Sequence, residues 1–253
     1  MRRFLHLTNR HRAPSVNLAL GVLLAFNAGA VNAGGFLLLQ RYTSHMTGFA
    51  SQIADGLALK HPSMTATAVG AIVSFAAGAA LTAALVNFAR RQGIRAVYAL
   101  PLVLEAALLM SFGLMGSLAL SSGSAHYFPP TVLLLSFIMG LQNAVGSKSS
   151  GGSIRTTHMT GNVTDLGMEL GKLLYWNRSG GGARPVVSDK ERLQRSGGLL
   201  LAFIAGGIAG ATGFQSAGFI FVVPLAMALL LLAAMPLFGV KTRRLKRQPA
   251  SIS

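Results

Sequence analysis

Residues 26–48 read FNAGAVNAGGFLLLQRYTSHMTG, and a related order of residues returns at 137–161 as FIMGLQNAVGSKSSGGSIRTTHMTG. Both stretches carry the pattern F-x-x-G-x-x-N-A inside an apolar segment, followed by the tetrapeptide HMTG. Two more matches keep the same order along the chain: Phe75-x-Ala77-Gly78 with Phe203-x-Ala205-Gly206, and Pro101-Leu102 with Pro224-Leu225. Four collinear matches indicate an internal duplication. We place the first unit at residues 16–125 and the second at 126–240.

The duplicated units are built from apolar segments of membrane-spanning length. Crossing about 30 Å of hydrocarbon as a helix takes about 20 apolar residues at about 1.5 Å of rise each. Six segments have this length: Leu18 to Leu39, Met64 to Ala89, Ala96 to Leu120, Pro129 to Gly146, Gly197 to Ser216 and Gly218 to Gly239. The chain is 52% hydrophobic and 11% charged, whereas soluble domains hold about 25% charged residues. The sequence therefore predicts an all-α polytopic membrane protein, with residues 1–253 as a single membrane domain.

The charge of the chain predicts its orientation. Its 253 residues include 22 Lys and Arg but only 6 Asp and Glu, a formal charge of +16. Cytoplasmic loops are enriched in Lys and Arg, and a cytoplasmic N-terminus leaves only Arg41 and Lys60 outside. This asymmetry predicts six crossings with both termini in the cytoplasm. It also accounts for the basic charge, so we expect no nucleic-acid partner. The basic tail, residues 241–253, suits anionic lipid headgroups.

Three crossings in each unit imply that the second unit is inverted relative to the first, because three is an odd number. We therefore expect six transmembrane helices in two inverted three-helix repeats, each with an amphipathic or re-entrant half-helix that starts at HMTG. In transporters built this way, the substrate site lies near the midplane between the repeats. The basic start and the sequence Ala28-Gly29-Ala30 also imitate a secretory signal peptide. Because the pattern recurs in mid-chain, cleavage there is not expected.

The HMTG segments carry the pattern of an amphipathic helix. Residues 156–174 place a polar and an apolar stripe side by side at helical spacing, with Thr156 or Thr157 as the N-cap. Free amides at a helix start attract an anionic or strongly dipolar group. We therefore expect the two helix starts to face each other across a central polar site. The alternative is that each segment lies on its own membrane face as an interfacial helix.

The candidate solute-binding residues are polar side chains in or next to the repeated motifs. They are Asn32, His45, Thr47, Gln142, Asn143, His158, Thr160, Asn162 and Asp165. For the asparagines, the alternative is a hydrogen bond between two helices, worth about 0.6 to 2 kcal/mol.

Glu105 is a separate candidate because it lies about 14 Å into the third span by helical rise, where an ionised carboxylate is costly. It is either a proton-coupling carboxyl group or a neutral side chain hydrogen-bonded to another helix.

The motifs FIMGLQNA at 137–144 and RTTHMTGNVTDLG at 155–167 resemble the YoaK family of bacterial multi-pass membrane proteins, a domain of unknown function. The resemblance covers nearly the whole chain and implies a protein of the bacterial inner membrane. It supplies neither catalytic residues nor a substrate. The first copy departs from the family, which usually has Asp where this chain has Asn32 and Asn where it has Phe49.

The remaining function classes can be compared by their motifs. The chain has no cysteine, no H-E-x-x-H, no G-x-S-x-G and no G-x-x-x-x-G-K-[ST], so we expect neither an enzyme nor an ATP-driven pump. We expect no metal and no cofactor, although His45, Met46, His158 and Met159 are chemically suited to copper(I). The sequence favours a secondary transporter of a small polar or anionic solute, with its site between the HMTG segments. The alternative is a non-transporting scaffold or regulator. The expected partners are the lipid bilayer and a small solute, and the sequence leaves room for a homo-oligomer.

Overall fold

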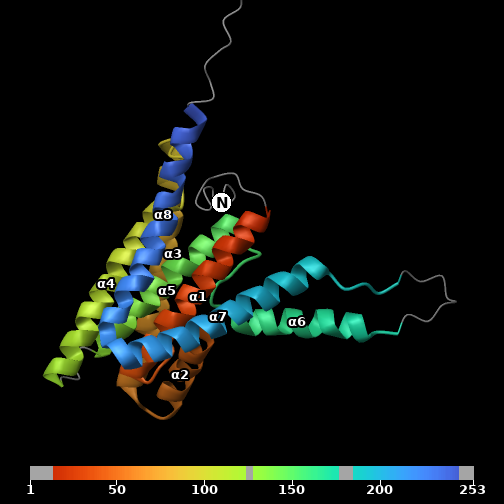
Figure 1. Cartoon of the computed structure of the whole chain (residues 1–253). Coiled ribbons are helices and arrows are strands. Elements are labelled where there is room, and N and C mark those ends of the chain that lie inside the picture. The colour runs from red at the N-terminus through yellow and green to blue at the C-terminus, as the bar shows by residue number, and fades with distance from the viewer. Residues whose placement is uncertain (1–13, 124–127, 177–184, 245–253) are drawn as a thin grey trace, which may run out of the picture.

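The computed structural model describes residues 14–123, 128–176 and 185–244, and every regular element in these ranges is a helix (Figure 1). The elements in chain order are α1 (Pro14–Leu39), α2 (Met46–Ala58), α3 (Pro62–Arg91), α4 (Ala99–Ser122), α5 (Phe128–Ser150), α6 (Met159–Leu174), α7 (Lys190–Ala217), the 3-10 turn η3 (Gly218–Phe221) and α8 (Val222–Arg244). The all-α prediction is therefore confirmed. The arginines before α1 and the side chains of the tail 241–253 lie outside the described residues.

Several helices are long and apolar enough to cross a membrane, which indicates a membrane-embedded protein. Among the described residues there are five such stretches, of which α1, α3, α4 and α5 each supply one. The fifth, Lys190–Ala234, runs without interruption through α7, η3 and α8, whereas the sequence pattern predicts two separate segments here. The chain turns at Gly218, whose φ of 62° favours glycine, and Figure 1 shows α7 and α8 diverging from this turn.

Local sequence signals set several helix ends. Asp189 caps α7, because its Oδ1 accepts hydrogen bonds from the backbone N–H groups of Glu191 at 3.0 Å and Arg192 at 3.1 Å. Pro62 occupies the first turn of α3, where its missing N–H costs nothing. Gly123 ends α4 in the left-handed conformation, with φ 61°.

Glycines allow two pairs of helices to cross at very short range. A Cβ atom at Gly29 of α1 would overlap the carbonyl oxygen of Phe203 of α7, and one at Gly206 would overlap that of Phe26. The second pair repeats this arrangement, because Gly78 of α3 lies against the Phe137 carbonyl of α5 and Gly140 against that of Phe75. The four F-x-x-G sequences thus meet in two crossings, α1 with α7 and α3 with α5. Small residues at such positions let helix backbones approach closely.

The largest hydrophobic cluster contains residues of α4 and α8, which pack against each other. Phe112, Phe214 and Phe219 form an aromatic group at the turn between α7 and α8, with the Phe112 and Phe219 rings 5.4 Å apart and edge to face. α2 packs on α3, and α6 packs on α7. Figure 1 shows α6 and the first part of α7 extending sideways from the bundle. We call these two segments, residues 159–174 and 190–196, the arm.

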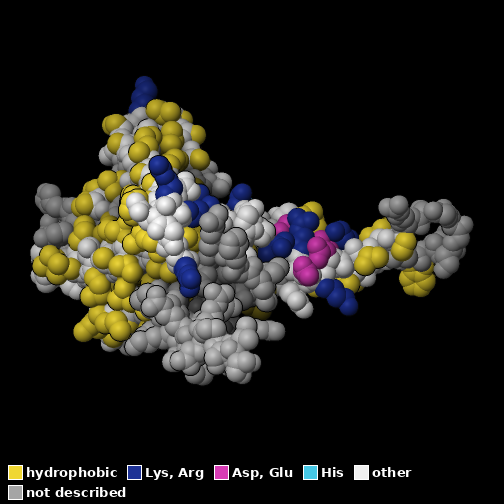
Figure 2. Space-filling model, turned by 90° about the horizontal axis from the view of Figure 1, so that it is seen from above, with side chains coloured by type: hydrophobic (Ala, Val, Ile, Leu, Met, Phe, Trp, Pro, Cys, Tyr) yellow, Lys and Arg dark blue, Asp and Glu magenta, His cyan; other side chains and the backbone are white. Residues whose placement is uncertain are grey.

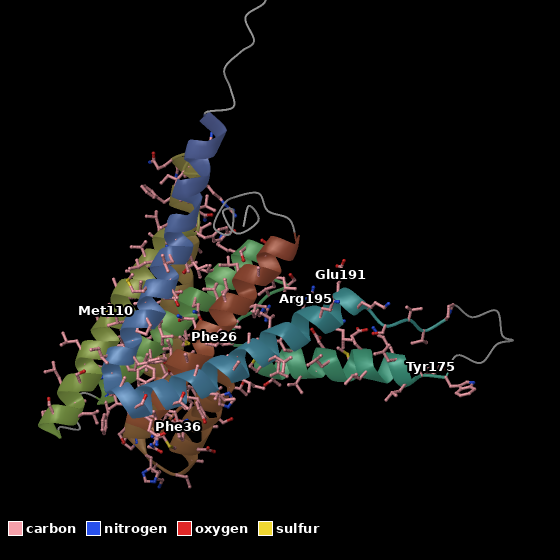
Figure 3. The ribbon with its side chains drawn as sticks, viewed as in Figure 1. Phe26, Phe36, Met110, Tyr175, Glu191 and Arg195 are labelled. Atoms are coloured by element: carbon pink, nitrogen blue, oxygen red, sulfur yellow. The ribbon has the colours of Figure 1, made fainter. Side chains whose placement is uncertain are left out.

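The charged residues are unevenly distributed over the surface. Figure 2, which looks down on the end where α8 finishes, shows Lys and Arg on this face and along the arm, and acidic side chains only on the arm. Figure 3 shows Tyr175 at the outer end of the arm and Glu191 and Arg195 on the first turns of α7.

Candidate functional site

The two HMTG segments begin short helices in the same way. α2 starts at Met46 with His45 as its N-cap, and α6 starts at Met159 with His158 as its N-cap. Neither histidine side chain caps the helix by a hydrogen bond. The prediction that Thr156 or Thr157 caps α6 is wrong, because the helix begins two or three residues later. Thr156 is instead fully buried.

The glycine of HMTG makes room for the histidine of the same motif. A Cβ atom at Gly48 would overlap Cδ2 of His45, and one at Gly161 would overlap Cδ2 of His158. Residues three apart share one face of a helix, so each imidazole ring lies over the first turn that follows it. The spacing H-x-x-G therefore holds an imidazole beside the uncapped amides of the helix start.

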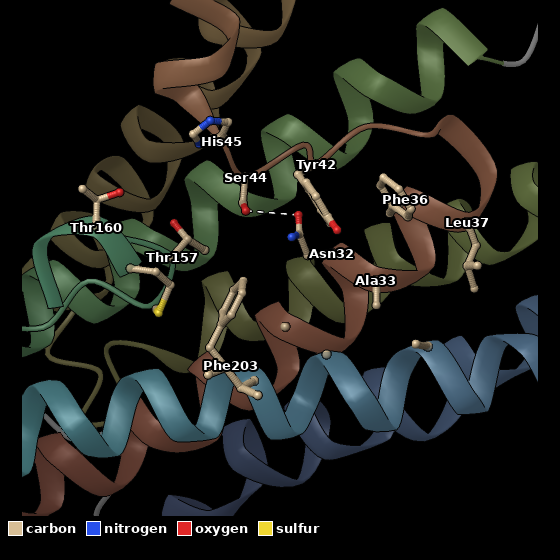
Figure 4. A pocket seen from close by; sticks show the side chains of 15 residues that line it. Asn32, Ala33, Phe36, Leu37, Tyr42, Ser44, His45, Thr157, Thr160 and Phe203 are labelled. Atoms are coloured by element: carbon tan, nitrogen blue, oxygen red, sulfur yellow. Dashed lines mark hydrogen bonds between the residues drawn. The ribbon is translucent and has the colours of Figure 1, made fainter. Parts of the chain in front are cut away.

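A larger cavity of about 470 Å³ lies between α1, α7 and the starts of α2 and α6 (Figure 4). Its polar lining side chains are Asn32, Tyr42, Ser44, His45, Thr157 and Thr160. The Ser44 hydroxyl donates a hydrogen bond of 3.1 Å to Oδ1 of Asn32, which fixes the segment before α2 against α1. Phe203 of α7 contributes to the apolar part of the lining.

A smaller cavity of about 220 Å³ is lined by both HMTG segments. Its lining includes His45, Met46 and Thr47 of the first copy and His158, Met159 and Thr160 of the second. The other lining residues are Ser44, Phe75, Asn143, Arg155 and Thr157. Five residues line both cavities, so the cavities adjoin at the helix starts: Ser44, His45, Thr157, Met159 and Thr160.

The two cavities use equivalent positions of the duplicated sequence. Asn32 and Phe203 line the larger cavity, and their counterparts Asn143 and Phe75 line the smaller one. Three residues before each histidine, Tyr42 lines the larger cavity and Arg155 lines the smaller. The equivalence is incomplete, because Asn32 accepts a hydrogen bond from Ser44 whereas Oδ1 of Asn143 has no hydrogen-bond partner among the described residues.

The electrostatics of the smaller cavity favour a negative or strongly dipolar guest. Two helix starts, which carry partial positive charge, line this cavity, and Arg155 adds a full positive charge. No Asp or Glu belongs to the lining of either cavity. Four of the candidate side chains are exposed at the protein surface: His45, Thr47, His158 and Thr160.

Three of the residues predicted to form one site, and the separate candidate Glu105, lie elsewhere. Gln142 points away from both cavities and bonds to Asn27 in the interior. Asn162 is 9% exposed and donates to the sulfur of Met159 at 3.8 Å. Asp165 lies on the arm and pairs with Arg192 at 2.7 Å. Glu105 is buried in α4 and lines neither cavity.

The sequence reasoning missed Tyr42, Ser44 and Arg155, all of which line a cavity. Comparison of the two copies offered a signal, because Ser44 and Thr157 both carry a hydroxyl group directly before HMTG. The four side chains considered for copper(I) also line the smaller cavity.

The polar stripe of α6 ties the arm together rather than facing a solute. Asp165 accepts hydrogen bonds from Arg192 at 2.7 Å and Ser196 at 3.3 Å. Glu169 bonds to Lys172 at 2.8 Å and to the backbone N–H of Asp189 at 2.7 Å. The hydrogen bond from Arg192 lowers the pKa of Asp165, and the bonds from Lys172 and Asp189 lower the pKa of Glu169.

These shifts predict that acid loosens the arm. A carboxyl group whose pKa is lowered by folding stabilises the folded arm above its ordinary pKa of about 4, and this contribution is lost as the pH falls through the lowered value. Spin labels on cysteines at the exposed positions Leu170 and Lys190 should show a narrow distance distribution at pH 7 that broadens in acid. Arg192→Gln should broaden it already at pH 7. A distribution that is equally narrow in all three conditions would contradict the role of these ion pairs.

Comparison with known proteins gives one match. The model of one protein family, described as a protein of unknown function (DUF1275), matches residues 20–235. No curated protein and no solved structure matches the chain.

Proposed function

The chain belongs to the DUF1275 family of proteins of unknown function, which is the family of the YoaK-like proteins. Because the family has no known function, we infer the function from the site of this chain. We propose that the protein is a secondary transporter of a small anionic solute. One observation carries the proposal: the starts of α2 and α6 line one cavity together with Arg155, and no acidic residue lines that cavity. Converging helix starts at the meeting point of two repeats are typical of transporter sites.

The proposed solute lies between the two HMTG segments. The uncapped amides of Met46, Thr47 and Gly48 and those of Thr160 and Gly161 supply hydrogen-bond donors, and Arg155 supplies the compensating charge. The Met159 N–H already donates to the carbonyl oxygen of Thr157 at 3.0 Å. Thr47 and Thr160 add hydroxyl groups, which suit the oxygen atoms of an oxyanion or a carboxylate. Asn143, whose Oδ1 has no partner among the described residues, can accept a hydrogen bond from a hydroxyl group of the solute.

We further propose that the chain forms two inverted repeats with six crossings and both termini in the cytoplasm of a bacterial cell. The support is the pairing of four F-x-x-G sequences in two equivalent crossings, α1 with α7 and α3 with α5. In this arrangement, the larger and the smaller cavity are equivalent sites on opposite sides of the HMTG segments. During transport, the larger and the smaller cavity then exchange their shapes. Each cavity in turn admits the solute from one side of the membrane.

The decisive experiment is an uptake screen in proteoliposomes with labelled nitrate, sulfate, phosphate and lactate, each alone. We expect saturable uptake of at least one anion. Because the chain has no cysteine, single cysteines at Thr47 and Thr160 can be labelled without further changes, and the transported anion should slow labelling at both. Uptake no faster than in empty liposomes, with each cysteine labelled from one side under all conditions, would contradict the proposal. That result would favour a non-transporting scaffold or regulator.

A further inference from the structure

A second polar group lies in the interior, apart from both cavities. It consists of Glu105 of α4, Gln142 of α5 and Asn27 of α1, whose exposed fractions are 0%, 0% and 3%. Gln142 Nε2 donates to Asn27 Oδ1 at 3.5 Å, and Asn27 Nδ2 donates to the carbonyl oxygen of Leu225 in α8 at 3.1 Å. The group therefore joins four helices. We call these three side chains the interior cluster.

Three acceptor atoms of the interior cluster have no hydrogen-bond donor among the described residues. Both carboxyl oxygens of Glu105 and Oε1 of Gln142 are buried without a hydrogen-bond partner among the described residues. A buried acceptor without a partner is costly, and a buried carboxylate without a cation is far more so. Gln142 is nevertheless the polar neighbour of the Glu105 carboxyl group. A single proton on Glu105 lowers this cost, because it removes the charge and the resulting O–H group can donate to Oε1 of Gln142.

Among the described side chains, no charged neighbour offers an alternative means of neutralisation. Glu105 is the one acidic residue inside the apolar helices α1, α3, α4, α5 and the described part of α8. In the part of the chain whose side chains are described, the elements packed on α4 carry Arg90 and Arg91 at the end of α3 and Lys148 at the end of α5. None of these forms an ion pair with Glu105 among the described residues. Glu105 is close to the first residue of α4, because six residues of rise from Ala99 amount to about 9 Å.

Neighbouring residues connect the interior cluster to the proposed solute site. On α5, Gln142 belongs to the cluster, and the next residue, Asn143, lines the smaller cavity. On α1, Asn27 belongs to the cluster, and Asn32 lines the larger cavity. A movement of α5 or α1 that changes a cavity therefore also moves a member of the interior cluster.

We propose that Glu105 is a proton-binding site, held by Gln142 and Asn27, that couples proton movement to the solute cavities through α5 and α1. Release breaks the O–H bond, leaves a carboxylate on Glu105 and passes H⁺ to water on one side of the membrane. Uptake from the other side reverses this step. The coupling rests on the proposed transport function, but the protonation of Glu105 does not. Three free oxygen acceptors are also too few for the usual coordination shell of a metal cation.

Infrared spectroscopy of the full chain in lipid tests the protonation directly. With ¹³C-labelled glutamate at neutral pH, we expect the C=O band of one protonated carboxyl group, which disappears in Glu105→Gln and persists in the control Glu169→Gln. Absence of the band in the native chain, or its persistence in Glu105→Gln, would overturn the proposal. A carboxylate band that shifts on addition of Na⁺ would overturn it in favour of a sodium site.

The coupling is tested in proteoliposomes with nitrate, sulfate, phosphate and lactate as probes. In Glu105→Gln, whose amide can still donate to Gln142, accumulation driven by a pH gradient should fall to the level of empty liposomes. Exchange of the same anion without a gradient should remain within about twofold of the native rate. Gradient-driven accumulation that survives in Glu105→Gln would overturn the coupling. Failure of the native chain to move any of these anions would instead overturn the proposed function, and the infrared result would still decide protonation.

Discussion

Arg155→Gln is expected to raise the KM for anion uptake at least tenfold. A hydrogen bond to a charged group contributes about 1.5 to 3 kcal/mol, and Arg155 is exposed, so the lower end of this range applies. About 1.4 kcal/mol corresponds to a factor of ten. Arg155→Glu should have a larger effect, because it places a negative charge beside the two helix starts. Initial uptake rates in proteoliposomes, measured against the concentration of the anion found in the screen, give both values.

The matched control is Arg91→Gln. Arg91 is also exposed and ends α3, but it lines neither cavity. The substitution therefore removes the same charge from the protein without changing the site. Its KM should remain within about twofold of the native value. If Arg155→Gln and Arg91→Gln change KM by the same factor, Arg155 acts only through the overall charge of the protein, and the proposed anion site is wrong.

Gly206→Ala is expected to destabilise the protein by about 3 kcal/mol, the upper end of the usual cost of overpacking. Its added methyl group meets the backbone of Phe26, and a backbone carbonyl cannot rotate away as a side chain can. The helices α1 and α7 would therefore have to separate. Gly140→Ala should cost about the same, because it meets the backbone of Phe75 in the equivalent crossing. Thermal unfolding in detergent provides the measurement.

The adjacent residue supplies the control. A Cβ atom at Gly207 would lie 3.8 Å from the carbonyl oxygen of Gly29, which is an ordinary contact. Gly207→Ala should thus leave the unfolding temperature unchanged or raise it, since alanine favours a helix over glycine by about 0.5 to 1 kcal/mol. Equal effects of Gly206→Ala and Gly207→Ala would show that the two helices are less tightly apposed than the contacts indicate.

The sequence predicts the helices well because their signals are local. Long apolar segments set the membrane helices. Two differences concern the last segments: α7 begins at Lys190 and not at Gly197, and the 3-10 turn keeps α7 and α8 in one helical stretch. The repeated HMTG motif correctly predicts two short helices. The N-cap of α6 was predicted at Thr156 or Thr157 because threonine is a common N-cap residue, whereas His158 holds this position.

Tertiary contacts explain the remaining differences. Gln142 and Asn143 are neighbours, and nothing in their spacing tells which side chain faces a cavity and which faces Glu105. Asp165 has the helical spacing of a site residue, but its partner Arg192 lies 27 residues away, across a segment whose path the sequence does not predict. The F-x-x-G sequences indicate a duplication, yet their pairing between copies depends on the arrangement of the helices in space.

The hydrogen bond from Ser44 to Asn32 has a thermodynamic consequence. If the two copies were identical, the two conformers would have equal free energy, because each copy in one conformer would have the structure of the other copy in the second conformer. Here the bond exists in one copy, and the corresponding oxygen of Asn143 has no partner among the described residues. A net hydrogen bond contributes about 1 kcal/mol, so a bond that formed in only one of the two conformers would give a population ratio of about five to one. Thr157 carries a hydroxyl group at the position equivalent to Ser44, so under the proposed exchange a bond to Asn143 can replace the bond to Asn32. The difference in strength between the serine and the threonine bond then sets the preferred resting side.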